Sequence, residues 1–155
     1  MLSIHEVMTP RPITATPGTT LGELVWQFDR LNFNAIPVVD VGGVLVGIVT
    51  KLDVLRALRP APDVEVRTPQ AITSQRVESI MRRGVVAVEP EDPLVVAADL
   101  MVATRLRSIP VVQRSGGVAR IVVGIVSQGD LLRGLRVGLV GAPVASGLES
   151  PWEPS

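Results

Sequence analysis

The chain has 155 residues, enough for one domain or two small ones, and its 15 basic and 15 acidic side chains cancel. This balance argues against a partner held by overall charge, such as bulk nucleic acid or an anionic membrane. Hydrophobic residues make up 46% of the sequence and aromatic residues only 3%, so the expected core consists of Val, Ile, Leu and Ala, a composition that favours strands. The absence of cysteine excludes disulfides and thiolate metal sites and fits a reducing compartment.

Targeting and membrane signals are not visible in the sequence. The first residues lack the basic and apolar regions of a signal peptide. No apolar run reaches the length of about 18 residues that a membrane span requires. We therefore expect a cytoplasmic protein that does not bind a membrane.

The first predicted elements precede residue 32. Prolines keep residues 7–12 extended, and residues 13–15 form a short strand candidate. Thr20 and Glu23 have the spacing of a capping box, in which a hydroxyl and a carboxylate satisfy the first free amides of a helix. Apolar residues on one face after Thr20 predict an amphipathic helix.

A hairpin and a second helix complete the first half. Residues 35–39 and 44–49 are β-branched segments around Gly42-Gly43, which predicts two antiparallel strands. A helix is expected from about 52 to 58, so the order is β-α-β-β-α. The proline-containing stretch that follows, 59–76, predicts a linker with room for a local turn of helix.

The second half repeats the first at a nearly constant spacing. Pro110 lies 73 positions after Pro37. Because the loop around Gly116-Gly117 is longer, the spacing grows to 77 positions between Asp53 and Asp130.

Within this half, Asp92 followed by Pro93 predicts a helix N-cap and its first residue, and a closing helix is expected at about 131–136. The predicted units are 1–58, a linker 59–76, a second unit 77–137 and a flexible tail 138–155 that contains Trp152.

The ordered double occurrence of these motifs resembles a tandem pair of cystathionine β-synthase (CBS) domains, also called a Bateman module. The resemblance covers roughly 2–135 and rests on three segments that each recur: Val7-Met8-Thr9-Pro10, Ile36-Pro37-Val38-Val39-Asp40, and residues 47–53. It implies an α+β (α/β) fold of two β-α-β-β-α repeats packed with pseudo-twofold symmetry. A unit of about 60 residues buries little surface alone, which also favours two packed copies.

The resemblance also implies a function. Such modules bind adenosine-containing ligands (AMP, ADP, ATP or S-adenosylmethionine) in two related clefts, act as sensors and not as catalysts, and commonly form disc-like homodimers. The expected mechanism is a ligand that bridges the repeats and shifts their orientation for a partner protein, whose identity the sequence does not indicate. The alternative is a constitutive dimerisation module with non-functional clefts.

Two pairs of residues are the strongest site candidates: Thr50 with Asp53, and Ser127 with Asp130. Each pair lies where a strand passes into a helix. One interpretation is a helix cap, because a hydroxyl followed three residues later by an acid is a capping box. The other is a ligand site, because a carboxylate in this turn can accept hydrogen bonds from the ribose hydroxyls. The resemblance favours the ligand role, with capping as a compatible second role.

By position, the resemblance implies further site residues in clefts that mix the two repeats. The adenine pocket would be lined by four apolar residues: Ile13, Ile48, Val86 and Ile125. The sugar and phosphates would be bordered by the residues before each Ile-Pro pair: Asn34, Ala35, Arg107 and Ser108. The alternative for each apolar residue is ordinary core packing.

The two clefts are expected to differ in charge. Lys51 follows Thr50, whereas Gln128 follows Ser127. If Arg107 joins Lys51 near Asp53, that cleft prefers phosphates and the Asp130 cleft is more neutral. The alternative is that both cations are solvated surface charges.

Patterns for other functions are absent from the sequence. His5 is the only histidine and has no clustered metal ligands near it, so no metal site is expected. No nucleophile-base set, phosphate-binding loop or nucleic-acid-binding motif is present, so neither an enzyme nor a nucleic-acid partner is expected.

Overall fold

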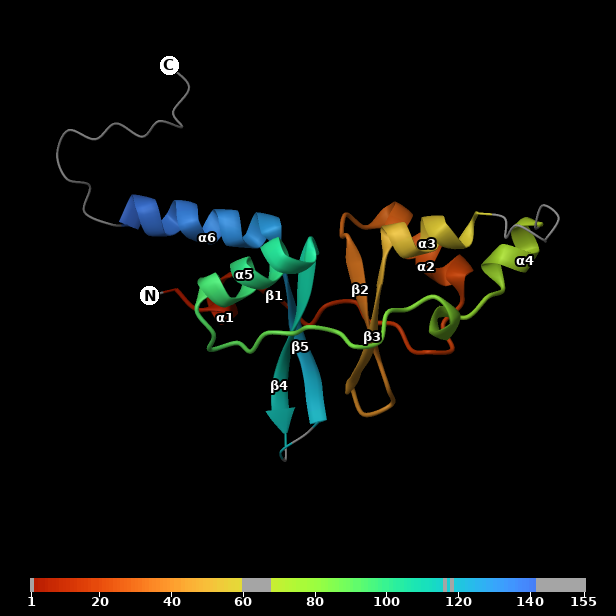
Figure 1. Ribbon diagram of the computed structural model, residues 1–155, viewed down its shortest axis with the longest axis horizontal. Coiled ribbons are helices and arrows are strands. Elements are labelled where there is room, and N and C mark those ends of the chain that lie inside the picture. The colour runs from red at the N-terminus through yellow and green to blue at the C-terminus, as the bar shows by residue number, and fades with distance from the viewer. Residues whose placement is uncertain (1, 60–67, 116, 118, 142–155) are drawn as a thin grey trace, which may run out of the picture.

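The computed structural model describes residues 2–59, 68–115, 117 and 119–141. Within these ranges the chain forms two halves that lie side by side, each with a hairpin and its own helices (Figure 1). Most of the predicted tail, including Trp152, lies outside these ranges. No helix of the described part is long and apolar enough to cross a membrane.

The first half follows the predicted order closely. Its elements are α2 (Leu21–Arg30), β2 (Ala35–Val39), β3 (Leu45–Thr50) and α3 (Lys51–Ala57). The Thr20 hydroxyl accepts from the Glu23 amide at 3.3 Å, and the Glu23 carboxylate accepts from the Thr20 amide at 3.0 Å. The predicted capping box is therefore confirmed. The strands β2 and β3 pair antiparallel, and Asp40 Oδ1 accepts from the Gly42 and Val44 amides in the turn.

The second half has the same elements with different ends. They are α5 (Leu94–Thr104), β4 (Ser108–Ser115), β5 (Ala119–Ser127) and α6 (Gln128–Gly141). The prediction that Asp92 caps α5 is wrong by one residue, because Pro93 occupies the N-cap. The Asp92 carboxylate instead accepts from the Glu89 amide at 2.8 Å and closes the preceding turn. Helix α6 extends beyond the predicted 131–136 at both ends.

The expected first strand of each repeat is reduced to a single parallel bridge. Ala15 bridges Val38, and Val88 bridges Val111. Residues 16–19 turn immediately after Ala15, where the Thr16 amide donates to the Thr19 hydroxyl at 3.0 Å, so the strand cannot continue. The predicted linker contains the expected local helix, α4 (Pro69–Thr73).

The two repeats exchange their leading segments. Helix α1 (Ile4–Val7) and strand β1 (Thr9–Pro10) open the first repeat, yet β1 pairs with β5 of the second. Ile4 is fully buried in a cluster with residues of the second half: Val88, Ala97, Met101, Ile109, Val111, Val126 and Leu131.

The return exchange involves the 3-10 helix η1 (Val77–Ser79). Val77 is fully buried among residues of the first half: Ala15, Leu24, Phe28, Ile36, Val38, Val49 and Val54. Ile48 and Arg82 exchange backbone hydrogen bonds of 2.9 Å each. Each half is thus completed by the first segment of the other repeat.

Glycine permits this exchange at two corresponding positions. A Cβ atom on Gly47 would lie 2.6 Å from Met81 Sδ, and one on Gly124 would lie 2.5 Å from Met8 Sδ. Both distances are far below an ordinary carbon–sulfur contact. The same Met–Gly contact therefore occurs twice. In each case the methionine of an exchanged segment packs against the glycine of β3 or β5.

The halves also meet through their hairpins. Ala35, Leu45, Ile48, Val85 and Val112 form a buried cluster between the two hairpins. The Val122 amide donates to the Gly43 carbonyl at 3.1 Å across this junction. In Figure 1, α3 and α6 lie along one edge of the molecule and the turn between β2 and β3 lies at the opposite edge.

Candidate functional site

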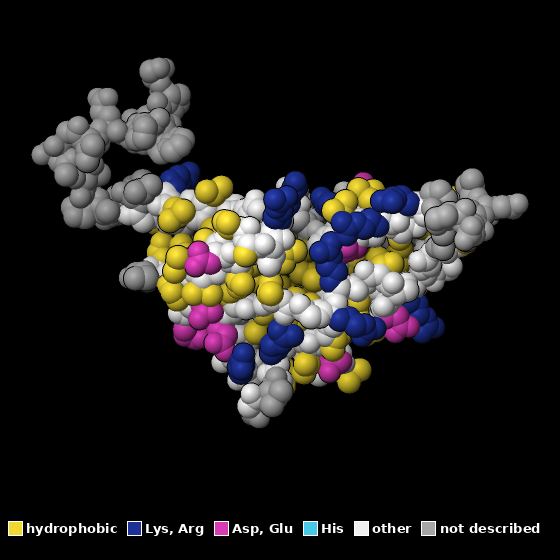
Figure 2. Space-filling model, viewed as in Figure 1, with side chains coloured by type: hydrophobic (Ala, Val, Ile, Leu, Met, Phe, Trp, Pro, Cys, Tyr) yellow, Lys and Arg dark blue, Asp and Glu magenta, His cyan; other side chains and the backbone are white. Residues whose placement is uncertain are grey.

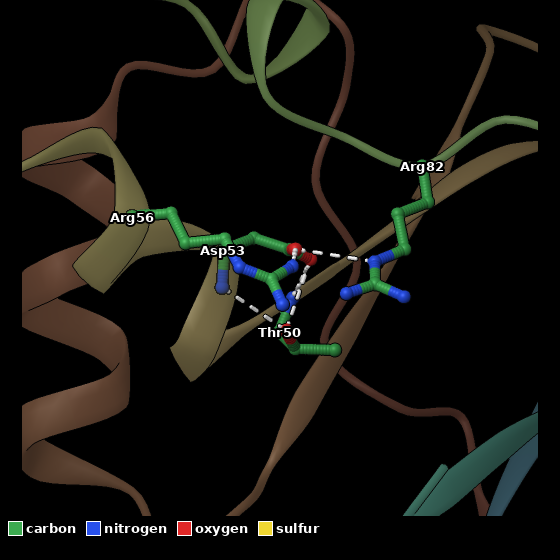
Figure 3. A network of polar contacts seen from close by, with 4 residues as sticks. All are labelled: Thr50, Asp53, Arg56 and Arg82. Carbon is green, nitrogen blue, oxygen red and sulfur yellow. Dashed lines mark hydrogen bonds and ion pairs between the residues drawn. The ribbon is translucent and has the colours of Figure 1, made fainter. Parts of the chain in front are cut away.

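Asp53 is a buried carboxylate at the start of α3, with 5% of its surface exposed (Figure 3). Its Oδ2 accepts from the Thr50 amide and from the Thr50 hydroxyl, both at 2.9 Å. The Asp53 amide donates to Thr50 Oγ1 at 3.2 Å. The capping role of this pair is therefore realised in full, and it uses mainly one carboxylate oxygen.

The other oxygen of Asp53 faces two arginines. Arg82 Nε donates to Oδ1 at 3.2 Å, and Arg56 Nη1 lies 3.6 Å from the same atom. Figure 3 shows Arg56 extending from α3 and Arg82 approaching from the segment that follows η1. Arg82 belongs to the second repeat, so this carboxylate joins the two repeats.

A cleft of about 700 Å³ opens beside this network. Both repeats contribute to its walls. Six predicted site residues line it: Asn34, Ala35, Thr50, Lys51, Arg107 and Ser108. Seven lining residues had not been predicted: Leu52, Leu55, Arg56, Arg82, Thr104, Arg105 and Leu106. Asp53 lies behind Thr50 and Arg82 and is not itself part of the wall.

The lining of this cleft is strongly basic. Five of its residues are cations, namely Lys51, Arg56, Arg82, Arg105 and Arg107, and none is acidic. Figure 2 shows Lys and Arg side chains gathered across the middle of this face, where the two halves meet. Among the described residues, Arg56 and Arg82 pair only with Asp53, and the other three cations form no ion pair. A positive, partly enclosed surface of this kind attracts anions.

Asp130 has the same local geometry as Asp53. It is 5% exposed, its Oδ2 accepts from the Ser127 amide at 2.8 Å, and its amide donates to the Ser127 hydroxyl at 3.1 Å. Arg133 pairs with its second oxygen from within the same helix. Neither Ser127 nor Asp130 lines the 700 Å³ cleft.

The apolar residues predicted for the adenine pocket lie elsewhere. Ile48, 2% exposed, belongs to the buried cluster between the hairpins, and Ile125 packs against that cluster. Val86 is half-buried and Ile13 is 40% exposed. None of the four lines the cleft.

Sequence signals for the missed cations are weak but present. Arg56 lies three residues after Asp53, a spacing that brings side chains together on a helix. Arg82 directly follows Met81, at the position that Thr9 holds in the first repeat. No group of three or more potential metal ligands occurs among the residues that the structure describes.

Two interlocked β-α-β-β-α repeats with a shared polar cleft define a paired-repeat module in which one cleft is built by both copies. The chain belongs to the CBS domain family, which matches residues 4–60 and 77–137. It is thus a tandem CBS pair, as the sequence motifs predicted.

Curated relatives share this region of the chain. CBS domain-containing protein YhcV of Bacillus subtilis is 33% identical over 132 residues, which cover 84% of each chain. Protein MJ1225 of Methanocaldococcus jannaschii is 31% identical over 133 residues, but the chain spans only 46% of its length. The chain spans 22% of the L-aspartate semialdehyde sulfurtransferase of the same organism, at 30% identity.

Solved structures agree on the fold. The CBS domain pair of protein MJ0100, crystallised with 5′-methylthioadenosine and S-adenosyl-L-methionine, is 28% identical with a TM-score of 0.71, covering 89% of this chain and 98% of that one. The CBS-pair protein CBSX2 of Arabidopsis thaliana has a TM-score of 0.73 at 23% identity, covering 90% and 98%.

Proposed function

We propose that this chain is a regulatory module that binds an adenosine-containing ligand, an adenine nucleotide or S-adenosylmethionine, in the cleft beside Asp53. The observation that carries the proposal is the cleft itself, whose walls come from both repeats and which opens beside the buried Asp53 carboxylate, behind Thr50 and Arg82. The complex of the MJ0100 domain pair with two adenosyl compounds, at 28% identity, supports this ligand class.

The proposed mechanism follows from the position of the cleft. Residues 50–56 and residues 104–108 lie on opposite repeats, so a ligand between them contacts both. A ligand shifts an equilibrium only by its differential affinity for two arrangements. Binding therefore favours one relative orientation of the halves, which a partner protein or a second copy of the chain recognises.

Isothermal titration of the full chain with ATP, AMP and S-adenosylmethionine tests the proposal. Binding also stabilises the fold: a ligand present at 100 times its dissociation constant raises the free energy of unfolding by about 2.7 kcal/mol. Asp53→Asn is expected to abolish binding in the cleft, whereas Asp130→Asn, the matched substitution in the other repeat, leaves it intact. If the wild-type chain binds none of the three ligands, the proposal is contradicted and a dimerisation module without functional clefts is favoured.

A homodimer belongs to the same proposal. Its support is the row of leucines on α3 and α6, of which Leu55, Leu132 and Leu135 are more than half exposed. A cytoplasmic location and the absence of nucleic acid and membrane among its partners stay predictions from the sequence.

A further inference from the structure

The two Asp-centred regions can be compared position by position, because matching backbone contacts fix the correspondence. The Lys51 amide donates to the Asn34 carbonyl at 3.2 Å, and the Gln128 amide donates to the Arg107 carbonyl at 2.9 Å. Each central strand also pairs with the exchanged segment at the same point. Ile48 pairs with Arg82, and Ile125 pairs with Thr9.

This correspondence reveals a large difference in charge. The cations of the Asp53 cleft are five: Lys51, Arg56, Arg82, Arg105 and Arg107. Their counterparts around Asp130, in the same order, are Gln128, Arg133, Thr9, Asn32 and Asn34, of which one is a cation. The basic lining of the Asp53 cleft is therefore specific to that cleft and is not repeated around Asp130.

We infer that the Asp53 cleft selects phosphorylated adenosine ligands over neutral and cationic adenosyl compounds, and that Arg82 is the residue that makes the selection. The inference rests on the proposed function and specifies the ligand class of the same cleft.

The role of Arg82 follows from its present partner. Its Nε already occupies Asp53 Oδ1 at 3.2 Å, so ribose hydroxyls that approach this oxygen must displace it. A phosphate group compensates the displaced guanidinium, because arginine binds phosphate oxygens in a two-point geometry. Adenosine offers no such compensation, and S-adenosylmethionine brings a sulfonium cation into a cleft that is already positive. Thr9, at the corresponding position, is uncharged and cannot form such an ion pair with Asp130.

The size and exposure of the site agree with a nucleotide. The volume of about 700 Å³ lies within the range of about 300–1,000 Å³ that is typical of small-molecule sites. Arg82 and Arg56 are 48% and 53% exposed, so both can turn toward a ligand without leaving a packed core. Their half-exposure also predicts that ATP binding weakens as salt rises.

The test compares ATP, adenosine and S-adenosylmethionine by isothermal titration of the full chain, with Asp130→Asn present in every sample to isolate the Asp53 cleft. In that background, ATP is expected to bind about tenfold or more tightly than adenosine or S-adenosylmethionine. Arg82→Gln is expected to weaken ATP binding by about tenfold. It should strengthen adenosine binding, because the ribose hydroxyls no longer compete with Arg82 for Asp53.

Two further variants separate selection from general charge. Arg107→Gln removes a cation that does not touch Asp53, so it should weaken ATP and leave adenosine unchanged. Arg83→Gln, at an exposed neighbour outside the cleft, should change neither. The inference is overturned if Arg82→Gln shifts both ligands in the same direction or shifts neither.

The inference and the proposed function fail in different ways. Equal affinity for ATP and adenosine, or tighter binding of S-adenosylmethionine, overturns the inference alone. Binding of none of the three ligands overturns both. A thermal melt of each variant identifies one that has lost its fold, and Arg107→Gln then decides the charge preference independently of Arg82.

Discussion

Two carboxylates in this chain have the same local role but different surroundings. Glu23 and Asp53 each cap a helix through a threonine three residues earlier. Glu23 is exposed and bonds only within its own turn, whereas Asp53 is buried and also receives Arg82 from the other repeat. The free energy of each interaction should differ accordingly, because removing a buried charged partner leaves others unsatisfied.

We expect Asp53→Ala to destabilise the chain more than Glu23→Ala. The exposed cap should cost about 0.5–1 kcal/mol and the buried one about 2–3 kcal/mol, since it also leaves Arg82 without its partner. Urea denaturation without ligand measures both free energies of unfolding. Equal losses would show that the Arg82 contact adds nothing to the cap.

Sequence could predict the cap but not this contact. Thr50 and Asp53 are three residues apart, so the local pattern is sufficient. The Arg82–Asp53 hydrogen bond joins residues 29 positions apart and depends on which half the segment after η1 packs against. Lys51 and Arg107, which were predicted to meet near Asp53, both line one cleft. This part could be predicted because both residues lie at strand ends that the sequence pattern indicates.

The exchanged segments α1 and η1 are the elements that tie the halves together. Ile4 and Val77 are corresponding residues, 73 positions apart, and both are fully buried. Ile4, from the first repeat, lies in the core of the second half, and Val77, from the second repeat, lies in the core of the first half. The apolar pattern predicts that such segments pack, but it is the same whether they pack on their own half or on the other. The exchange could therefore not be read from the sequence.

Truncation of either residue should affect the opposite half. Ile4→Ala is expected to cost about 2–5 kcal/mol, and Val77→Ala less, because it removes a smaller side chain from a core. Amide hydrogen exchange should accelerate most in β4 and β5 for Ile4→Ala, and most in β2 and β3 for Val77→Ala. The reverse pattern would contradict the exchange of segments.

At the scale of the whole molecule, exposed leucines recur along one edge. Helices α3 and α6 both lie there, and they occupy corresponding places in the two repeats (Figure 1). Leu55 corresponds to Leu132, and Leu58 to Leu135, at 56%, 67%, 49% and 55% exposure respectively. A surface that is nearly symmetric about its own centre is suited to a twofold contact with a second copy, in which each half meets its counterpart.

We therefore expect the chain to run as a dimer in size-exclusion chromatography with light scattering, at twice its 16.5 kDa. Leu132→Glu with Leu135→Glu should give the monomer mass, because two carboxylates would have to be buried without partners at the contact. Both residues lie outside the Asp53 cleft, so ligand affinity measures separately whether the cleft needs the dimer. Val41→Glu, on the hairpin turn at the opposite edge, should leave the mass unchanged. A wild-type monomer, or a double variant that stays dimeric, would place the contact elsewhere or exclude it.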